Sequence, residues 1–292
     1  MMITSWLVDG DGIICLANGT PLVLTLDHTP RCAIYLGFVE THHGKPILQT
    51  ANLPVSHAMD IKDAIKLGLI AAYGDGYDTK DQRHLRKISF TQFLDTADMP
   101  TLAAITRAIT LVRWQNDHRF CSRCGTKAVP HAHGEHAKVC PKCHHHAYPR
   151  VQPCVIVAIT HTDTTTGKPQ ILLAQHQRHK VQGVYGLIAG FVESGETLEM
   201  AAHREVLEEV GLCIDSPRYF GSQSWPYPSN LMAGFVADYA SGTIAICPDE
   251  LVDAQFFDFD NLPKIPRTGT IAHALICHVI HHFNDKHNTP NA

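Results

Sequence analysis

The chain has 292 residues, of which 45% are hydrophobic and 18% charged, and its formal net charge is −4. A chain of this length accommodates about two domains with substantial cores. The slight acidic excess argues against a nonspecific nucleic-acid or membrane-surface binder, which normally carries a basic excess. No apolar run approaches the roughly 20 residues of a membrane span, and the first residues lack the basic start of a secretory signal. We therefore expect a cytoplasmic protein with no membrane association.

The first part of the chain, residues 1–117, is predicted to form an α/β domain with a structural or dimerising role. PLVLTLD (21–27) and RCAIYLGFVE (31–40) have the composition of strands. AMDIKDAIKLGLIAAYG (58–74) has the spacing of an amphipathic helix, and a second helix is expected from Leu102 to Asn116. This region contains no constellation of residues typical of catalysis.

The rest of the chain divides into a short polar segment, residues 118–150, and a longer domain, residues 151–292. The short segment is rich in Cys, His and Lys. The longer domain is predicted to contain strands over 152–160 and 169–176, a helix over 197–210, strands over 232–239 and 254–259, and a closing helix over 270–283. Mixed strands around one polar helix predict an α/β sandwich.

Four of the ten cysteines form two CxxC pairs, Cys121 with Cys124 and Cys140 with Cys143. Four thiolates on two tight turns favour tetrahedral Zn²⁺ with no open position, which is a structural site. The alternative is that the two cysteine pairs are unrelated and bind no common metal. Because zinc ribbons often bind nucleic acid, nucleic-acid binding stays open as a function of this segment. Six histidines are alternative ligands, although four thiolates already satisfy the ion: His131, His133, His136, His144, His145 and His146.

The predicted helix within GETLEMAAHREVLEEVGL (195–212) places three glutamates on one side. Glu205, Glu208 and Glu209 stand at i, i+3 and i+4, and like charges at this spacing destabilise a helix by roughly 0.2–0.5 kcal/mol per pair. An apolar stripe of Ala202, Val206 and Val210 runs beside them, so the helix is expected to be packed. Carboxylates at the edge of a buried face need cations, and oxygen ligands favour Mg²⁺ or Mn²⁺. A solvated acidic face is the alternative for this segment taken alone.

The surrounding residues resemble the Nudix box, G-x5-E-x7-R-E-U-x-E-E-x-G-U, where U is aliphatic. Every constrained position matches: Gly190, Glu196, Arg204, Glu205, Val206, Glu208, Glu209, Gly211 and Leu212. The resemblance implies a Nudix α/β/α sandwich over residues 151–292 that hydrolyses a nucleoside diphosphate linked to another moiety. It implies that Glu205 and Glu209 bind the metals, that Glu208 is a ligand or a base, and that Arg204 orients the carboxylates together with Glu196.

A second stretch, SQSWPYPSNLM (Ser222–Met232), resembles SQPWPFPxSLM, the signature of the NADH pyrophosphatases within this family. A zinc ribbon preceded by an N-terminal α/β domain is also the layout of that subfamily. Three positions depart from the signature: Ser224, Tyr227 and Asn230. Two prolines around Trp225 and Tyr227 suit a rigid wall for a flat base. The resemblance implies that the following residues contact substrate: Ser222, Gln223, Trp225, Tyr227 and Asn230.

Further site residues are implied by the same subfamily resemblance. Phe191 would stack on the nicotinamide-side base, Glu250 would be an additional Mg²⁺ or Mn²⁺ ligand, and Ala272 would contribute a backbone contact. Tyr148 would reach the partner subunit's site, because these enzymes are homodimers. The expected reaction is hydrolysis of NADH or NAD⁺ to nicotinamide mononucleotide and AMP, together with removal of NAD caps from RNA 5′ ends.

Two alternative functions remain. One is a Nudix hydrolase of ADP-ribose or a dinucleoside polyphosphate, since the Nudix box names a reaction and not a substrate. The other is a zinc-ribbon regulator of nucleic acids that keeps the fold only for ligand binding. Degenerate regulators usually lose glutamates of the box, whereas Glu205, Glu208 and Glu209 are all present here.

Overall fold

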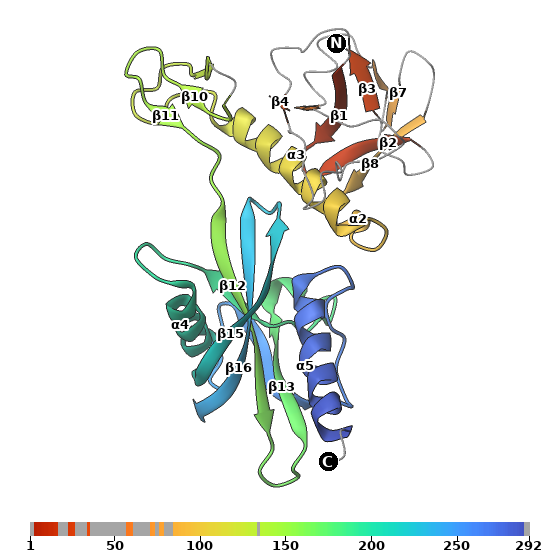
Figure 1. Ribbon diagram of the computed structural model, residues 1–292, viewed down its shortest axis with the longest axis vertical. Helices are drawn as coiled ribbons and strands as arrows, with labels where there is room; N and C mark the ends of the chain where they lie inside the picture. Colours follow the sequence, from red (N-terminus) through yellow and green to blue (C-terminus); the bar gives the residue numbers. More distant parts are fainter. Residues whose placement is uncertain are drawn as a thin grey trace. The chain divides into compact units, whose positions relative to one another are not determined.

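The computed structural model describes residues 3–16, 23–26, 34–35, 57–60, 71–73, 76–78, 84–132 and 135–288. It consists of two compact units (Figure 1). The first comprises Met1–Arg150 together with Pro226–Ser229, and the second comprises Val151–Trp225 together with Asn230–Ala292. Among the described helices, none combines the length and apolarity that crossing a bilayer requires. The boundary expected between residues 117 and 118 stays a prediction.

The first unit contains a mixed sheet whose described strands run in the order β4-β5-β1-β2-β8-β7-β6, with β3 paired to β1. Strand β5 is parallel to β1, whereas the other pairs are antiparallel. The strands are β1 (Ile3–Asp9), β2 (Gly12–Leu16), β3 (Val23–Leu26), β4 (Ile34–Tyr35), β5 (His57–Asp60), β6 (Ala71–Tyr73), β7 (Gly76–Asp78) and β8 (His84–Ser89).

Two helices follow this sheet, α2 (Phe90–Phe93) and α3 (Met99–Asp117). The side chain of Asp98 accepts a hydrogen bond from Thr101 N at 2.9 Å, which caps the start of α3. The helix packs on β1 and β5. Its Ile105 and Ile109 are fully buried, as are Trp6 and Met59 of these strands. The predicted helix from Leu102 to Asn116 is therefore confirmed.

The helix predicted over residues 58–74 is wrong at both ends. Residues 57–60 form β5 and residues 71–73 form β6, while 61–70 lie outside the described residues. Ala58 and Met59 are fully buried beside β1, so pairing with a distant strand overrides the local helical spacing. Of the two strands predicted earlier in the chain, the described parts are strands: Val23–Leu26 and Ile34–Tyr35.

The cysteine-rich segment forms a small antiparallel sheet in the order β11-β10-β9. Its strands are two residues each, β9 (Val129–Pro130), β10 (Lys138–Val139) and β11 (His146–Ala147). A sheet of this size buries too little apolar surface to be stable on its own. The stability of the segment therefore depends on other interactions, which the four cysteines provide.

The second unit is a mixed sheet in the order β15-β16-β12-β13-β17, with β14 paired to β12. Strands β12 and β16 are parallel, and the remaining pairs are antiparallel. The elements are β12 (Gln152–Thr162), β13 (Pro169–His176), the 3-10 turn η1 (Gln177–His179), β14 (Ile188–Phe191), α4 (Leu198–Val210), β15 (Leu212–Trp225), β16 (Asn230–Gly242), β17 (Leu251–Asp258) and α5 (Ile271–Asn288).

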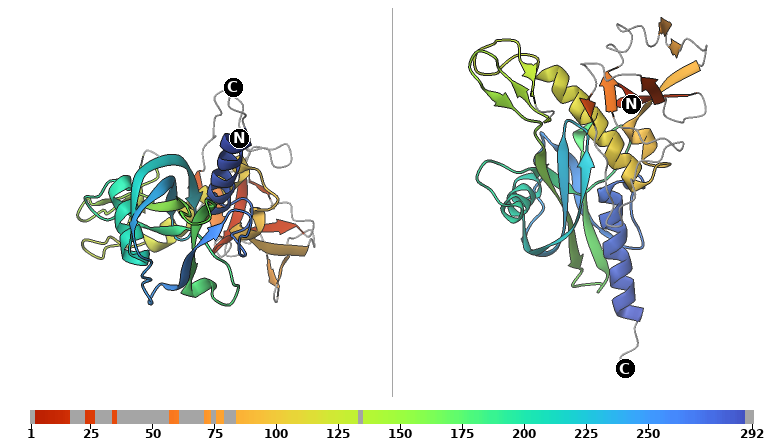
Figure 2. Two further views of the ribbon diagram at one scale, coloured as in Figure 1. Left: turned by 90° about the horizontal axis from the view of Figure 1, so that it is seen from below. Right: turned by 45° about the horizontal axis from the view of Figure 1, so that its top comes forward.

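Helices α4 and α5 cover opposite faces of this sheet (Figure 2). Alternate residues of β12 point to the two faces, as the pleat of a strand requires. Val155 and Val157 share a core with Val206 of α4, whereas Ile156 packs with Leu275 of α5. The α/β/α sandwich is thereby confirmed. Elements predicted over 152–160, 169–176, 197–210, 232–239, 254–259 and 270–283 are all present, but β14 and β15 were missed.

Candidate functional site

Helix α4 owes its boundaries to local sequence. The hydroxyl of Thr197 accepts a hydrogen bond from Met200 N at 3.2 Å, and Gly211 ends the helix at a φ of 71° that favours glycine. Ala202, Val206 and Val210 are fully buried on the sheet. These contacts set the rotation of the helix and therefore the direction in which its glutamates point.

Arg204 is the centre of a hydrogen-bond network among the carboxylates of this helix and the preceding loop. Its guanidinium donates to Glu196 through Nε (2.6 Å) and Nη2 (2.9 Å), and to Glu205 and Glu208 through Nη1 (both 2.9 Å). Nη2 also donates to the Phe191 carbonyl at 2.8 Å. The hydrogen bonds from Arg204 lower the pKa of Glu196 to about 2. Arg204 therefore holds three carboxylates through hydrogen bonds, and its role in orienting them for catalysis stays a prediction.

The close approach at Gly190 explains why the position is a glycine. A Cβ built there would lie 1.9 Å from Cδ of Glu205, so any side chain would displace this carboxylate. Gly190 lies on β14, opposite Val155 of β12. Strand β14, which the sequence did not predict, thus places the backbone of Gly190 against the carboxylate of Glu205.

Glu209 is a buried carboxyl and Glu205 a part-buried one, and their ionised forms call for cations. Only 6% of Glu209 is exposed, and burial, followed by the charges of Glu250 and Glu205, raises its pKa to about 8. Burial also raises the pKa of Glu205, against the opposing hydrogen bond from Arg204, and Glu250 adds to the repulsion. Carboxylates that repel each other in this way fit a divalent, oxygen-liganded ion. Glu250 therefore repels the two helix glutamates electrostatically, and its role as a metal ligand stays a prediction.

Glu208 and Arg178 complete the electrostatics of this site. The Glu208 side chain accepts a hydrogen bond from Arg204. Because it is 60% exposed, it is accessible either to a metal or to water. The positive charge of Arg178, on η1, offsets a small part of the rise in the pKa of Glu209. Arg178 is not predictable from the sequence, because a single basic residue after a strand carries no signal of its own.

The four cysteines of the CxxC pairs form one cluster. Their Sγ atoms lie 3.6 Å apart for Cys121 and Cys143, 3.5 Å for Cys124 and Cys140, and 3.5 Å for Cys124 and Cys143. Zn–S bonds of about 2.3 Å in a tetrahedron place sulfurs about 3.8 Å apart, so the geometry fits structural Zn²⁺. In the part of the chain that the structure describes, the cluster includes no histidine. His133 lies outside the described residues.

The signature stretch occupies the end of β15, the turn and the start of β16. Trp225 pairs with Asn230 across this hairpin. Asn230 Oδ1 is buried without a hydrogen-bond partner among the described residues, while Ser222 is exposed. Gln223 is buried, and its amide binds the backbone of Gly269 and Ile271. Substrate contact by Trp225, Asn230 and Ser222 stays a prediction.

The remaining predicted substrate residues differ in their surroundings. Phe191 is 51% exposed at the end of β14, so its ring is available for stacking. Ala272 is half-buried in the first turn of α5, next to the backbone that Gln223 binds. Tyr227 turns its hydroxyl toward Asp11 at 3.4 Å. Tyr148 is 52% exposed and belongs to the first unit. Their roles toward substrate stay predictions.

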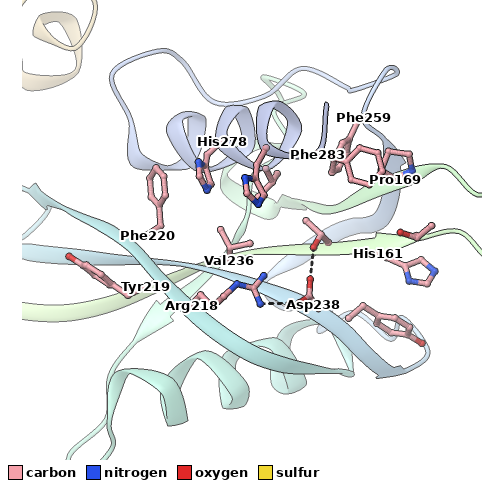
Figure 3. Close-up of a pocket in the computed structure, with 15 residues that line it drawn as sticks. His161, Pro169, Arg218, Tyr219, Phe220, Val236, Asp238, Phe259, His278 and Phe283 are labelled. Carbon is pink, nitrogen blue, oxygen red and sulfur yellow. Dashed lines mark hydrogen bonds and ion pairs between the residues drawn. The ribbon is translucent and has the colours of Figure 1, made fainter. Parts of the chain in front are cut away.

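The second unit also contains a pocket of about 900 Å³ between α5 and the sheet (Figure 3). Its lining includes the ion pair of Arg218 with Asp238, at 3.0 Å, and the rings of Phe220 and His278. None of the residues predicted for metal binding, catalysis or substrate contact lines it. The pocket is therefore separate from the carboxylate site.

Comparison with known families gives two matches. Residues 151–276 match the NUDIX domain, and residues 116–148 match the NADH pyrophosphatase zinc ribbon domain. The first contains the whole carboxylate site, and the second contains all four cysteines.

Curated relatives are named NAD-capped RNA hydrolase NudC. One from Shigella dysenteriae is 43% identical over 68% of this chain and 73% of its own length. One from Pasteurella multocida is 48% identical over 60% of this chain and 65% of its own length. One from Escherichia coli (strain HS) is 38% identical over 82% of this chain and 91% of its own length. The chain therefore belongs to the Nudix family, in the group that carries the NADH pyrophosphatase zinc ribbon.

Proposed function

We propose that the protein hydrolyses the pyrophosphate bond of NADH and NAD⁺, and that it removes NAD caps from RNA 5′ ends. The observation that carries this proposal is the mutually repelling set of buried Glu209, part-buried Glu205 and exposed Glu250, beside Arg204. Nudix hydrolases use Mg²⁺ or Mn²⁺, which this set would hold. The names of the relatives support NAD-linked substrates.

In this reaction the oxygen of a water molecule attacks one phosphorus and the bridging P–O bond breaks. The bound divalent cation would withdraw charge from the phosphate oxygens and the leaving phosphate. Glu205 and Glu209 would hold the ion, and the exposed carboxylate of Glu208 would hold the ion or accept the proton of water. Arg204 keeps three carboxylates in place, and the products are nicotinamide mononucleotide and AMP, or a 5′-monophosphate RNA.

The ring on the far side of the diphosphate would be bound by Phe191 and Trp225. Their expected stacking distinguishes NADH from ADP-ribose, which lacks the second base. The zinc cluster, having four thiolates and no open position, serves the fold and not the reaction. We also propose a cytoplasmic homodimer in which Tyr148 reaches the partner's site.

One assay separates the proposal from its alternatives. Purified protein is given NADH, NAD⁺, ADP-ribose, a dinucleoside polyphosphate and NAD-capped RNA, each with Mg²⁺ and with Mn²⁺. The proposal expects hydrolysis of NADH and of capped RNA at higher kcat/KM than the other compounds. Preference for ADP-ribose or the polyphosphate would contradict it, and binding without turnover would indicate the non-catalytic alternative.

A further inference from the structure

The turn Pro226–Ser229, in the middle of the signature stretch, is part of the first unit although strands of the second unit flank it in sequence. We propose that Arg113 and Tyr227 anchor this turn within the first unit, and that the anchor positions the signature residues that select the substrate. Arg113 is thus a positioning residue and not a catalytic one. The inference rests on the proposed function, which it extends to residues before the zinc ribbon.

Arg113 binds the turn through its backbone. The half-buried guanidinium, on α3, donates from Nη1 to the carbonyl oxygens of Pro226 and Pro228, the latter at 2.7 Å. Neither proline has an N–H, so the turn offers few donors to its own carbonyls. A guanidinium is always charged and rigid, and one such group binding two carbonyls defines both their separation and their direction.

Tyr227 binds the first unit through its side chain. Its ring meets that of fully buried Phe90 edge to face, with centroids 6.2 Å apart. Its hydroxyl lies 3.4 Å from Asp11 Oδ2, and the other oxygen of Asp11 lies 2.8 Å from Lys87 Nζ. Burial, together with the charge of Asp11, raises the pKa of Tyr227 to about 12, so the phenol keeps its proton and donates. These contacts bind the Tyr227 side chain to the first unit.

The anchored turn connects two residues expected to contact substrate. Trp225 immediately precedes it, Asn230 immediately follows it, and the two pair across the hairpin. Residues on either side of a short turn move with it, because the backbone has few free dihedrals between them. The metal-binding carboxylates lie elsewhere, on α4 and at Glu250. Loss of the anchor should therefore weaken recognition of the second base more than it slows bond cleavage.

The test compares Arg113→Met and Tyr227→Phe with the wild type and with a control. Arg119→Met is the matched control, because Arg119 is exposed and its Nε donates to the nearby Asn116 carbonyl at 3.1 Å. Arg113→Lys tests rescue by a cation that lacks the guanidinium geometry. Full-length zinc-loaded protein is assayed for kcat and KM with NADH and ADP-ribose. Hydrogen exchange is measured over residues 222–232 and over α4.

Arg113→Met should speed amide exchange over residues 222–232 by at least about tenfold and leave α4 unchanged. In the same variant, the ratio of kcat/KM for NADH to that for ADP-ribose should fall at least about fivefold, because KM for NADH rises. Tyr227→Phe should change the exchange rate and this ratio in the same direction, but by less. Arg113→Lys should restore part of the ratio. Unchanged exchange would overturn the anchor. Equal losses of kcat/KM on the two substrates would overturn the role of the anchor in selectivity. A wild-type protein that is inactive on NADH would refute the proposed function, and the exchange measurement would still test the anchor.

Discussion

Gln223 accepts a hydrogen bond from the backbone N–H of Ile271 at 2.8 Å, which joins the signature strand β15 to the start of α5. The same side chain donates through Nε2 to the Gly269 carbonyl at 2.8 Å. With 7% of Gln223 exposed, these two bonds satisfy both ends of a buried amide. The residue therefore holds the segment containing Ala272 beside the signature stretch.

Replacing Gln223 with leucine should lower the free energy of unfolding by about 1–3 kcal/mol, because the buried N–H of Ile271 and the part-buried carbonyl of Gly269 lose their partners. Urea unfolding followed by circular dichroism measures this difference. Gln182→Leu, at an exposed position, is the control and should change stability by less than about 0.5 kcal/mol. Equal effects of the two substitutions would show that the bonds to Gly269 and Ile271 do not stabilise the fold.

Glu209→Gln should reduce kcat for NADH by at least about 100-fold, since an ion ligand or water-activating carboxylate is lost. Steady-state kinetics with saturating Mg²⁺ or Mn²⁺ checks this result. Glu199→Gln, at an exposed position in the first turn of the same helix, serves as the control and should retain activity. A Glu209→Gln variant with nearly normal turnover would place the metal site elsewhere.

The stability of the protein without added Mg²⁺ or Mn²⁺ should fall with rising pH because of Glu209. Its folded pKa of about 8 lies above the ordinary 4.5, owing to burial and to the charges of Glu250 and Glu205. Between these values the folded state retains a proton that the unfolded state has released, so unfolding becomes easier as pH rises. Glu209→Gln removes this titrating group. Between pH 5 and pH 8 the free energy of unfolding of the variant, relative to that of the wild type, should therefore rise by at least about 1 kcal/mol. Parallel stability curves would contradict the shift.

Cys124→Ser should lower the melting temperature and the zinc content together, because one of four ligands is lost. Elemental analysis of the wild type should find about one zinc per chain. Molecules of the variant that remain folded should keep the kcat of the wild type, since the cluster has no open position for substrate. Cys213→Ser, at an exposed cysteine outside the cluster, is the control. Zinc-free wild type of full stability would disprove the structural site.

NADH should exceed ADP-ribose in kcat/KM by at least about tenfold, because base stacking on aromatic rings contributes roughly 1–3 kcal/mol per base. Phe191→Ala should shrink this ratio, since its half-exposed ring is the expected stacking partner. Phe220→Ala, at a ring that lines the separate pocket, should leave the ratio unchanged. Equal efficiencies of the wild type on the two substrates would refute the NADH preference and leave the Nudix reaction standing.

Features that depend on neighbouring residues were predictable from the sequence. The capping threonine and terminal glycine of α4 act within one turn of the helix, and the spacing of Glu205 and Glu209 follows from 3.6 residues per turn. The apolar runs of β12 and β13 reflect strands buried on both faces. The four cysteines likewise carry their ligand chemistry in their spacing, so the zinc cluster could be predicted from the sequence.

Tertiary structure decided the features that depend on distant partners. Strand β15 contains a proline and several polar residues, and its extended conformation follows from pairing with β16 across several irregularities. Ala58 and Met59 form a strand because β1 lies beside them, against their helical spacing. Arg113 is 113 residues from Pro226 in the chain, and Gln223 is 48 from Ile271. Such hydrogen bonds leave no local pattern, because their geometry arises only when the fold brings the two backbones together.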